Sequence, residues 1–148
     1  MLADLGKALS LELSAVQHYL TLAVLMDLRG DSTSADRFRR ETVEEMQHAE
    51  RIVKRMVSLG FSPGASQLRP AGQGTSLPVL LRLSKSLEEE LVAHYGEAAA
   101  LCQRLGDVEN HAFFEDLLLE ERQHGEALDS WLTSLESTHS RSLARAAV

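Results

Sequence analysis

Two short stretches of sequence, Glu45-Met46-Gln47-His48 and Glu121-Arg122-Gln123-His124, decide how this chain folds. Each places a glutamate and a histidine three positions apart inside a long helical pattern. Residues i and i+3 lie on the same face of a helix, so the carboxylate and the imidazole can bind one metal ion. One such pair is common by chance, but two pairs at matching places in the chain predict a metal site.

A single carboxylate precedes each stretch. Glu12 lies 33 positions before Glu45, and Glu90 lies 31 positions before Glu121. The chain therefore consists of two similar halves, each a helix with one glutamate followed by a helix with Glu-x-x-His. This is the ligand set of a di-iron or di-manganese carboxylate centre in a four-helix bundle, where every helix contributes from its inward face.

The ligand from the third helix must be chosen among three consecutive glutamates. Any of Glu88, Glu89 and Glu90 could face inward. We choose Glu90 because it lies one turn before His94 and three positions after Leu87, both of which follow the inward side of the helix. His94 itself is a further candidate, either as an extra ligand or as a partner of one.

Composition agrees with an all-α protein of one domain, residues 1–148. A chain of 148 residues can bury a sizeable core, and its 44% hydrophobic and 25% charged residues are ordinary for a globular protein. Leu, Ala and Glu dominate and there are only three prolines, which favours helix throughout.

Charge and cysteine usage exclude several classes of protein. The net charge of −7 argues against a nucleic-acid-binding face, which needs basic residues. The one cysteine, Cys102, cannot form an intrachain disulfide and fits a reducing, cytoplasmic setting. The N-terminus lacks the basic and apolar regions of a signal peptide, and no stretch has about 18 consecutive apolar residues, so we expect no membrane segment.

Apolar residues recur at alternating steps of three and four along four segments, as bundle helices require. The predicted helices cover about residues 2–29, 35–59, 76–105 and 108–135, and the tail 137–148 is a candidate for a short fifth helix. The segment 61–75 is rich in Gly, Pro, Ser and Gln and predicts a long crossover. It is long enough for the second and third helices to run parallel.

The predicted ligands carry enough charge to hold two divalent ions in the core. Four carboxylates contribute a formal charge of about −4 and two divalent ions +4, so the filled site is nearly neutral. Mixed oxygen and nitrogen ligation suits Fe(II) or Mn(II), and Zn(II) could also bind. A pair of Fe(II) ions could pass two electrons to O₂ or peroxide. The ligands are Glu12, Glu45, His48, Glu90, Glu121 and His124.

Roles within this set follow from the repeat. Glu45 and Glu121 are the expected bridges between two metals, and Glu12 and Glu90 the terminal ligands. Tyr19, about two turns after Glu12 on the inward stripe, could hydrogen-bond a ligand or act as a nearby redox group. Metal binding should release protons, because four buried carboxylates cannot all stay ionised without it.

The residues of these helices resemble bacterioferritins over most of the chain. The matching stretches are Leu11 to Tyr19, Glu44 to Arg51, Glu90-Leu91 and Glu120 to His124. The resemblance implies a ferritin-like fold, a ferroxidase centre at the six ligands, and a 24-subunit iron-storage cage built from two-fold dimers. It also implies haem b shared across a dimer, with Met46 as its axial ligand.

Other ferritin-like proteins resemble the chain less. Rubrerythrins carry a Cys-x-x-Cys pair and an additional glutamate where this chain has Ala93, and mini-ferritins of the Dps type place their ligands across subunits. The chain departs from bacterioferritins in its Pro/Gly-rich crossover, its short C-terminal segment, Arg40 and Ala127. Two alternatives therefore remain: a di-metal oxidase or peroxidase without a cage, and a non-enzymatic helical dimer that binds haem or metal.

Overall fold

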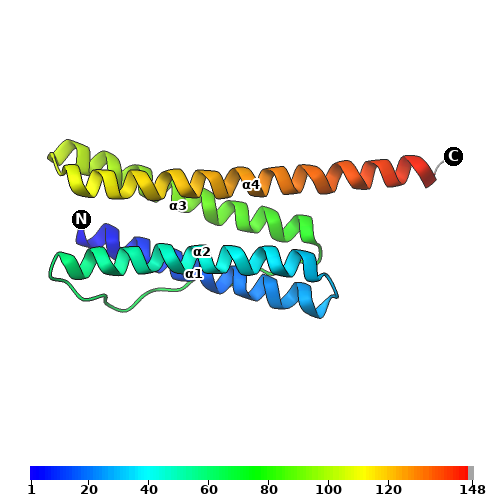
Figure 1. Ribbon diagram of the computed structural model, residues 1–148, viewed down its shortest axis with the longest axis horizontal. Coiled ribbons are helices and arrows are strands. Elements are labelled where there is room, and N and C mark those ends of the chain that lie inside the picture. Colours follow the sequence, from blue (N-terminus) through cyan, green and yellow to red (C-terminus); the bar gives the residue numbers. More distant parts are fainter. Residues whose placement is uncertain (147–148) are drawn as a thin grey trace.

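A computed structural model shows an all-α four-helix bundle, which confirms the predicted fold class (Figure 1). It describes the backbone of residues 1–146 and the side chains of residues 1–138. The helices are α1 (Leu2–Leu28), α2 (Ser32–Ser58), α3 (Leu77–Leu105) and α4 (Val108–Ala146).

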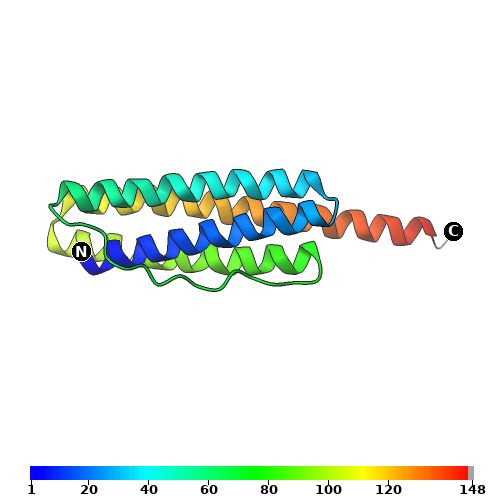
Figure 2. The same ribbon diagram turned by 90° about the horizontal axis from the view of Figure 1, so that it is seen from below.

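The bundle consists of two antiparallel helix pairs, α1 with α2 and α3 with α4. A long irregular segment leaves the end of α2 and runs along the bundle to the start of α3, as Figure 2 shows. Helices α2 and α3 therefore run in the same direction, and the crossover predicted for residues 61–75 is confirmed. This connection places the inward faces of all four helices around one axis.

The two helix hairpins turn by the same local chemistry. Gly30 and Gly106 adopt φ values of 79° and 71°, a left-handed conformation that ends a helix without strain in glycine. The aspartate after each glycine accepts a hydrogen bond from a backbone N–H three residues later, of Ser34 in one case and Asn110 in the other. Because Asp31 is the N-cap, α2 begins at Ser32, three residues before the predicted start.

The core combines aliphatic side chains with a layer of aromatic rings. Tyr19 stacks near Phe38, and Tyr95 lies beside Phe114, with all four rings buried. Helix α1 is long and apolar enough to cross a membrane by composition alone, but 56% of that stretch is buried inside the bundle. Its apolar residues therefore serve the core.

The crossover is fastened to α1 by a ladder of side chains one helical turn apart. Ser10 and Ser14 accept hydrogen bonds from the backbone N–H groups of Gln67 and Arg69, at 3.2 and 3.0 Å. His18 Nδ1 accepts the N–H of Gly72 at 3.0 Å. An irregular segment cannot satisfy its own backbone groups, so these bonds hold it against the bundle.

Gly72 also marks a close approach between the crossover and the bundle. A Cβ added there would lie 2.7 Å from Cε1 of His18. The imidazole cannot easily withdraw, because its Nε2 is fixed 2.9 Å from Oγ of Ser84 on α3. A side chain at position 72 would therefore displace either the crossover or His18.

The last helix is longer than predicted. No glycine or proline follows Leu135, and the backbone continues α4 as far as Ala146, past the end of the bundle (Figures 1 and 2). The candidate fifth helix over residues 137–148 extends to residues 147 and 148, which lie outside the described part of the chain.

Candidate metal centre

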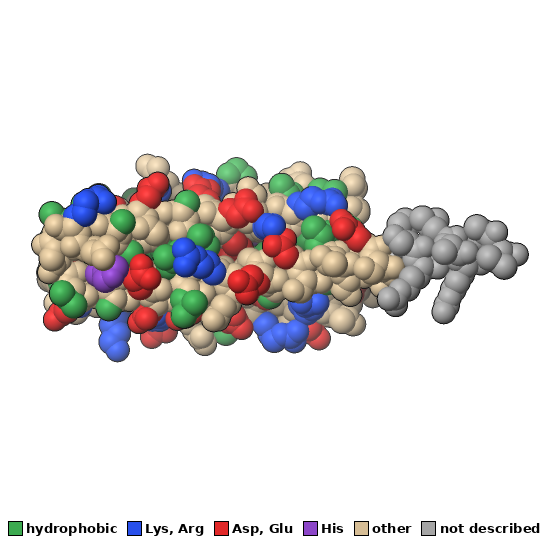
Figure 3. Space-filling model, turned by 90° about the horizontal axis from the view of Figure 1, so that it is seen from above, with side chains coloured by type: hydrophobic (Ala, Val, Ile, Leu, Met, Phe, Trp, Pro, Cys, Tyr) green, Lys and Arg blue, Asp and Glu red, His purple; other side chains and the backbone are tan. Residues whose placement is uncertain are grey.

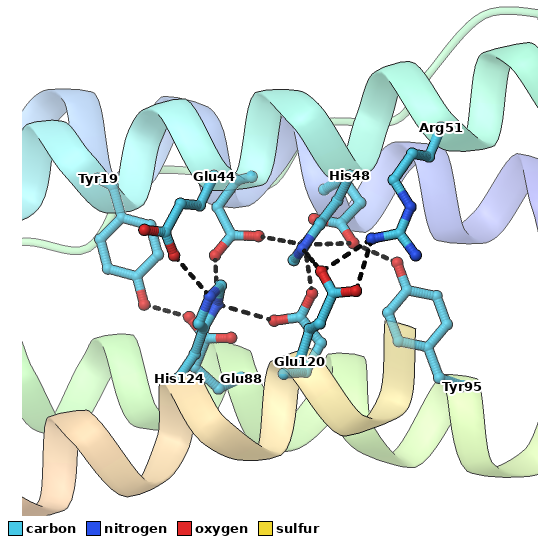
Figure 4. A network of polar contacts seen from close by, with 11 residues as sticks. Tyr19, Glu44, His48, Arg51, Glu88, Tyr95, Glu120 and His124 are labelled. Atoms are coloured by element: carbon cyan, nitrogen blue, oxygen red, sulfur yellow. Dashed lines mark hydrogen bonds and ion pairs between the residues drawn. The ribbon is translucent and has the colours of Figure 1, made fainter. Parts of the chain in front are cut away.

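Six side chains from all four helices meet at the middle of the bundle (Figure 4). Five of them come from the predicted ligand set, and the third helix contributes Glu88 in place of Glu90. All are buried except His124, which is partly covered. The cluster is Glu12 on α1, Glu45 and His48 on α2, Glu88 on α3, and Glu121 and His124 on α4.

The prediction of Glu90 as the inward glutamate is wrong. Glu90 is a third exposed and forms an ion pair with Arg69 of the crossover. Three consecutive helical residues span about 200°, so only one of them can face the core. Leu91 and Tyr95, three and seven positions after Glu88, are buried and mark the inward face on which Glu88 lies.

A constant spacing in the sequence would have identified Glu88. Glu12 and Glu45 are 33 positions apart, and so are Glu88 and Glu121. The whole cluster repeats after 76 residues, since Glu12, Tyr19, Glu45 and His48 each have an identical residue 76 positions later. The same spacing predicts Tyr95 from Tyr19, whereas the apolar pattern of the third helix alone does not.

The two histidines face the same two carboxylates. Nδ1 of His48 lies 3.3 Å from Oε2 of Glu45 and 2.7 Å from Oε1 of Glu121. Nδ1 of His124 lies 3.1 Å from Oε1 of Glu45 and 3.3 Å from Oε2 of Glu121. Each of these carboxylates thus presents one oxygen to each histidine, which is the geometry of a bridge between two metal ions.

Ligand atoms of the cluster fall into two overlapping groups. One consists of Glu12, Glu45, His48 and Glu121, and within each group the atoms lie within 4.8 Å of one another. The other consists of Glu45, Glu88, Glu121 and His124. Since Glu45 and Glu121 belong to both groups, they are suited to bridge two metal ions. Glu12 and Glu88 each belong to one group and are suited to be terminal ligands.

Burial raises the pKa of both terminal carboxyl groups. Burial raises the pKa of Glu12 well above its usual value, although its contact with His48 acts in the opposite direction. Burial likewise raises the pKa of Glu88, and the charges of Glu45 and Glu121 raise it further. Buried carboxylates that lack a cation are costly to ionise, so burial favours the protonated form of both groups.

The other half of the cluster is charged. Burial acts to raise the pKa of Glu121, but its contacts with His124, His48 and Glu88 lower it to about 2. Burial acts to lower the pKa of His124, but its carboxylate neighbours Glu121 and Glu45 raise it to about 12. The pKa of His48 is raised in the same way, against burial, by Glu12, Glu121 and Glu45. The carboxylates of the cluster thus favour the protonated form of both imidazoles.

A tyrosine hydroxyl holds each terminal carboxyl group. Tyr19 donates a hydrogen bond to Oε1 of Glu88, and Tyr95 donates one to Oε1 of Glu12. Both bonds join α1 to α3 across the core (Figure 4). Burial raises the pKa of both phenols well above the usual value, so they remain donors. Tyr19 therefore has the predicted place beside a candidate ligand.

An outer carboxylate orients each histidine through its second nitrogen. His48 donates from Nε2 to Oε2 of Glu120 at 2.8 Å, and Arg51 donates to both oxygens of the same carboxylate. His124 donates from Nε2 to Oε2 of Glu44 at 2.9 Å. A histidine that donates from Nε2 to a carboxylate directs Nδ1 to a metal, as in many metal proteins.

Two other candidates lie away from the cluster. His94 donates to the backbone carbonyl of Asp4 at 2.9 Å, so it joins α3 to the first turn of α1 and lies outside the ligand group. Met46 projects from the outer side of α2 and is half-exposed, beside Val43. The position of Met46 is that of a surface residue available to a haem or to a second subunit.

Comparisons with known proteins identify the family. Residues 2–138 match the family model described as the ferritin-like domain. The bacterioferritin of Brucella melitensis is 30% identical over 131 residues, which cover 88% of this chain and 81% of that protein. The bacterioferritin of Rhodobacter capsulatus is 30% identical over 129 residues, with 87% and 80% covered.

A solved structure gives the same result. The crystal structure of Rhodobacter capsulatus bacterioferritin, described with a metal-free dinuclear site and a haem iron, superposes with a TM-score of 0.87. The match has 28% sequence identity and covers 91% of this chain and 84% of that one. By family model, relatives and fold together, the chain belongs to the bacterioferritins within the ferritin-like family.

Proposed function

We propose that this protein oxidises Fe(II) to Fe(III) at the buried cluster, with O₂ or peroxide as oxidant, and stores the iron. The observation that supports this most directly is the position of Glu45 and Glu121, each of which offers one oxygen to the metal position of either histidine. Two ions held this close can act as a pair. Bacterioferritin relatives support iron as the metal.

The donor set fits two divalent ions of intermediate hardness. Four carboxylates and two imidazoles provide mixed oxygen and nitrogen ligation, which suits Fe(II) or Mn(II) and also binds Zn(II). Oε2 of Glu12, Glu45 and Glu88 are buried without a hydrogen-bond partner. Buried oxygens of this kind are costly unless a cation satisfies them, so the cluster is incomplete as a purely structural network.

The protein's own residues prepare the site. Tyr95 and Tyr19 orient the terminal carboxyl groups, and Glu120 and Glu44 orient the imidazoles. The four protonated groups must lose their protons before they can act as ligands, so binding is linked to proton release. When bound, a pair of Fe(II) ions supplies the two electrons that reduce O₂ or peroxide.

A haem site at a dimer interface is part of the proposal. Leu20 and Val24 on α1 and Val43, Met46 and Val57 on α2 are all about half-exposed apolar side chains. Solvent-exposed apolar faces of this kind mark association surfaces. We propose that two copies pair there, that the two Met46 thioethers bind haem b, and that dimers assemble into a 24-subunit cage in the cytoplasm.

Haem ligation is tested by spectroscopy of the purified protein. The Soret band of a bis-methionine haem is expected, and Met46→Leu should abolish it. Met56→Leu, the same exchange at a buried core position of the same helix, should leave the band intact. Haem that keeps its spectrum in Met46→Leu would contradict the assignment.

The ferroxidase proposal is tested by adding Fe(II) to the metal-free protein in air. Rapid oxidation of two Fe(II) per chain is expected first, followed by continued uptake of iron that stays soluble. Glu45→Ala should remove the rapid phase, and Glu50→Ala, an exposed residue on the same helix, should keep it. Uptake that stops near two per chain would mean a fixed di-iron cofactor without storage, and unchanged kinetics in Glu45→Ala would refute the site.

A further inference from the structure

A surface depression between α3 and α4 leads to the cluster. It has a volume of about 280 Å³, and its lining includes the candidate ligands Glu88 and Glu121. Both side chains are buried, and Oε2 of Glu88 has no hydrogen-bond partner. The depression therefore ends at two candidate ligands, and one of their oxygens, Oε2 of Glu88, has no hydrogen-bond partner. We refer to it as the α3/α4 groove.

Gly125 belongs to the lining of the α3/α4 groove and places no side chain in it. This glycine lies on α4 one position after His124, in the middle of a helix, where glycine is unfavourable by comparison with alanine. A Cβ added at Gly125 would have no atom within 4 Å. The space in front of the helix is therefore empty, and packing does not require a glycine there.

The α3/α4 groove is lined by charge. Five carboxyl groups and two basic groups contribute to it. Glu89, Glu126 and Asp129 are exposed at its rim, and Lys85 pairs with Asp129. Figure 3 shows acidic side chains, with fewer basic ones, around the middle of this face. An excess of acidic groups in a cleft attracts cations and raises their local concentration.

The repeat of the chain shows that part of this lining is found only in the second half. Ala49, which is buried, is the residue 76 positions before Gly125. Leu13 and Val53 correspond in the same way to Glu89 and Asp129. Two charged positions of the α3/α4 groove therefore have apolar counterparts between α1 and α2, whereas Glu126 has an acidic counterpart in Glu50.

On two other sides of the cluster, the side chains that cover it are themselves paired. Tyr19 and Tyr95 lie between α1 and α3, and both are fully buried. On the side of α2 and α4, His48 is covered by the ion pair of Arg51 with Glu120, and His124 is tied to Glu44. An ion that used these directions would have to break a hydrogen bond or an ion pair.

We propose that divalent cations reach the cluster through the α3/α4 groove, with Glu89 and Glu126 attracting the ion at the rim and Gly125 leaving the space for it to pass. This inference rests on the proposed function, since it requires that the cluster binds metal. It assigns to the three residues a role in the rate of binding, not in its equilibrium.

The test uses Co(II), whose absorbance reports ligation without any oxidation step. Metal-free protein is mixed with Co(II) in a stopped-flow instrument, and the amount bound at equilibrium is measured separately. Gly125→Leu should slow binding about tenfold or more, because the added side chain would fill part of the groove whose charge speeds entry. Gly125→Ala should give a smaller decrease, and all variants should still bind two ions per chain.

Two controls make the result specific. Gly96→Leu is matched, because Gly96 also lies inside a helix, on α3, with no atom within 4 Å of an added Cβ, but outside the lining of the groove. It should bind Co(II) at the wild-type rate. The double change Glu89→Gln with Glu126→Gln should slow binding at low salt and reduce its dependence on ionic strength.

The outcomes separate this inference from the proposed function. Wild-type protein that does not bind two Co(II) ions per chain would contradict the metal centre itself. Wild-type protein that binds two, with Gly125→Leu at the same rate, would overturn the groove alone. A loss of bound Co(II) at equilibrium in Gly125→Leu would also overturn it, because the residue would then shape the site and not the path to it.

Discussion

Exchange of Glu88 for Gln, compared with the same exchange at Glu90, tests the register of α3 most directly. The two positions are half a turn apart, so a single change in register moves one into the core and the other to the surface. We expect Glu88→Gln to lose one of two bound metal ions. Glu90→Gln should bind both, because Glu90 contacts only Arg69 of the crossover.

The size of the effect follows from linkage. An ion that binds only the folded protein, at a concentration 100 times its Kd, stabilises the protein by about 2.7 kcal/mol. Two ions contribute about 5 kcal/mol, which for a chain of this length raises the Tm by roughly 10–20 °C. Glu88→Gln should show about half of that rise. Glu90→Gln should show all of it, after a loss of about 0–1 kcal/mol from its exposed ion pair.

The assay is thermal unfolding with Co(II) or Zn(II) and with a chelator. In the chelator, Glu88→Gln should unfold close to wild type, since a glutamine keeps the volume and can still accept the hydrogen bond from Tyr19. If metal raised the Tm of Glu88→Gln fully and that of Glu90→Gln only in part, the assignment of Glu88 to the inward face of α3 would be refuted. Equal rises in both would refute any ligand role for this segment.

Three further predictions concern protons and the crossover. Binding of two Co(II) or Zn(II) ions at pH 7 should release about four protons per chain, from two histidines and two terminal carboxyl groups, measurable by calorimetry in buffers of different ionisation enthalpy; release of one or none would contradict the protonation scheme. Gly72→Ala should destabilise the fold by about 1–3 kcal/mol, because its Cβ would meet His18, while Gly64→Ala, with open space around it, should unfold like wild type in urea. Burial lowers the pKa of His18 to about 4 from an ordinary 6.5, so the unfolded chain binds more protons between these values and stability falls as pH falls through this range, by about 3 kcal/mol at most. His18→Asn should flatten that part of the stability profile, and an unchanged profile would show that His18 is not its cause.

Periodicity in the sequence was sufficient for the helices and their connections. Alternating apolar steps of three and four predicted four helices, and the Pro/Gly-rich stretch predicted a crossover and hence parallel α2 and α3. The ends were less accurate, because capping decides them: Asp31 starts α2 early, and the absence of a breaker after Leu135 lets α4 continue. The fastening of the crossover by Ser10, Ser14 and His18 depends on tertiary contact and could not be read from local pattern.

Within the site, the sequence located five of six clustered residues. It missed Glu88 because three adjacent glutamates differ only in their angle around the helix axis. The apolar pattern of one helix does not define the inward direction closely enough to choose among them. Comparison of the two halves removes the ambiguity, since Glu88 and Tyr95 repeat Glu12 and Tyr19 at the same spacing. The outer carboxylates Glu44 and Glu120 become visible only when α2 and α4 are placed side by side.

The repeat does not reproduce the arginine beside Glu120. Arg51 corresponds to Ala127, so the carboxylate that orients His48 has a cation beside it, and the carboxylate that orients His124 has none there. The two metal positions are thus similar in their inner donors and unequal in their surroundings. A chain that holds a single ion therefore has two non-equivalent forms. The two positions should fill with two separate binding constants, and the ions bound at them should have distinct spectra. The two metal positions therefore differ in their electrostatic surroundings, although the bundle is nearly symmetric. This difference exists before any oxidant binds.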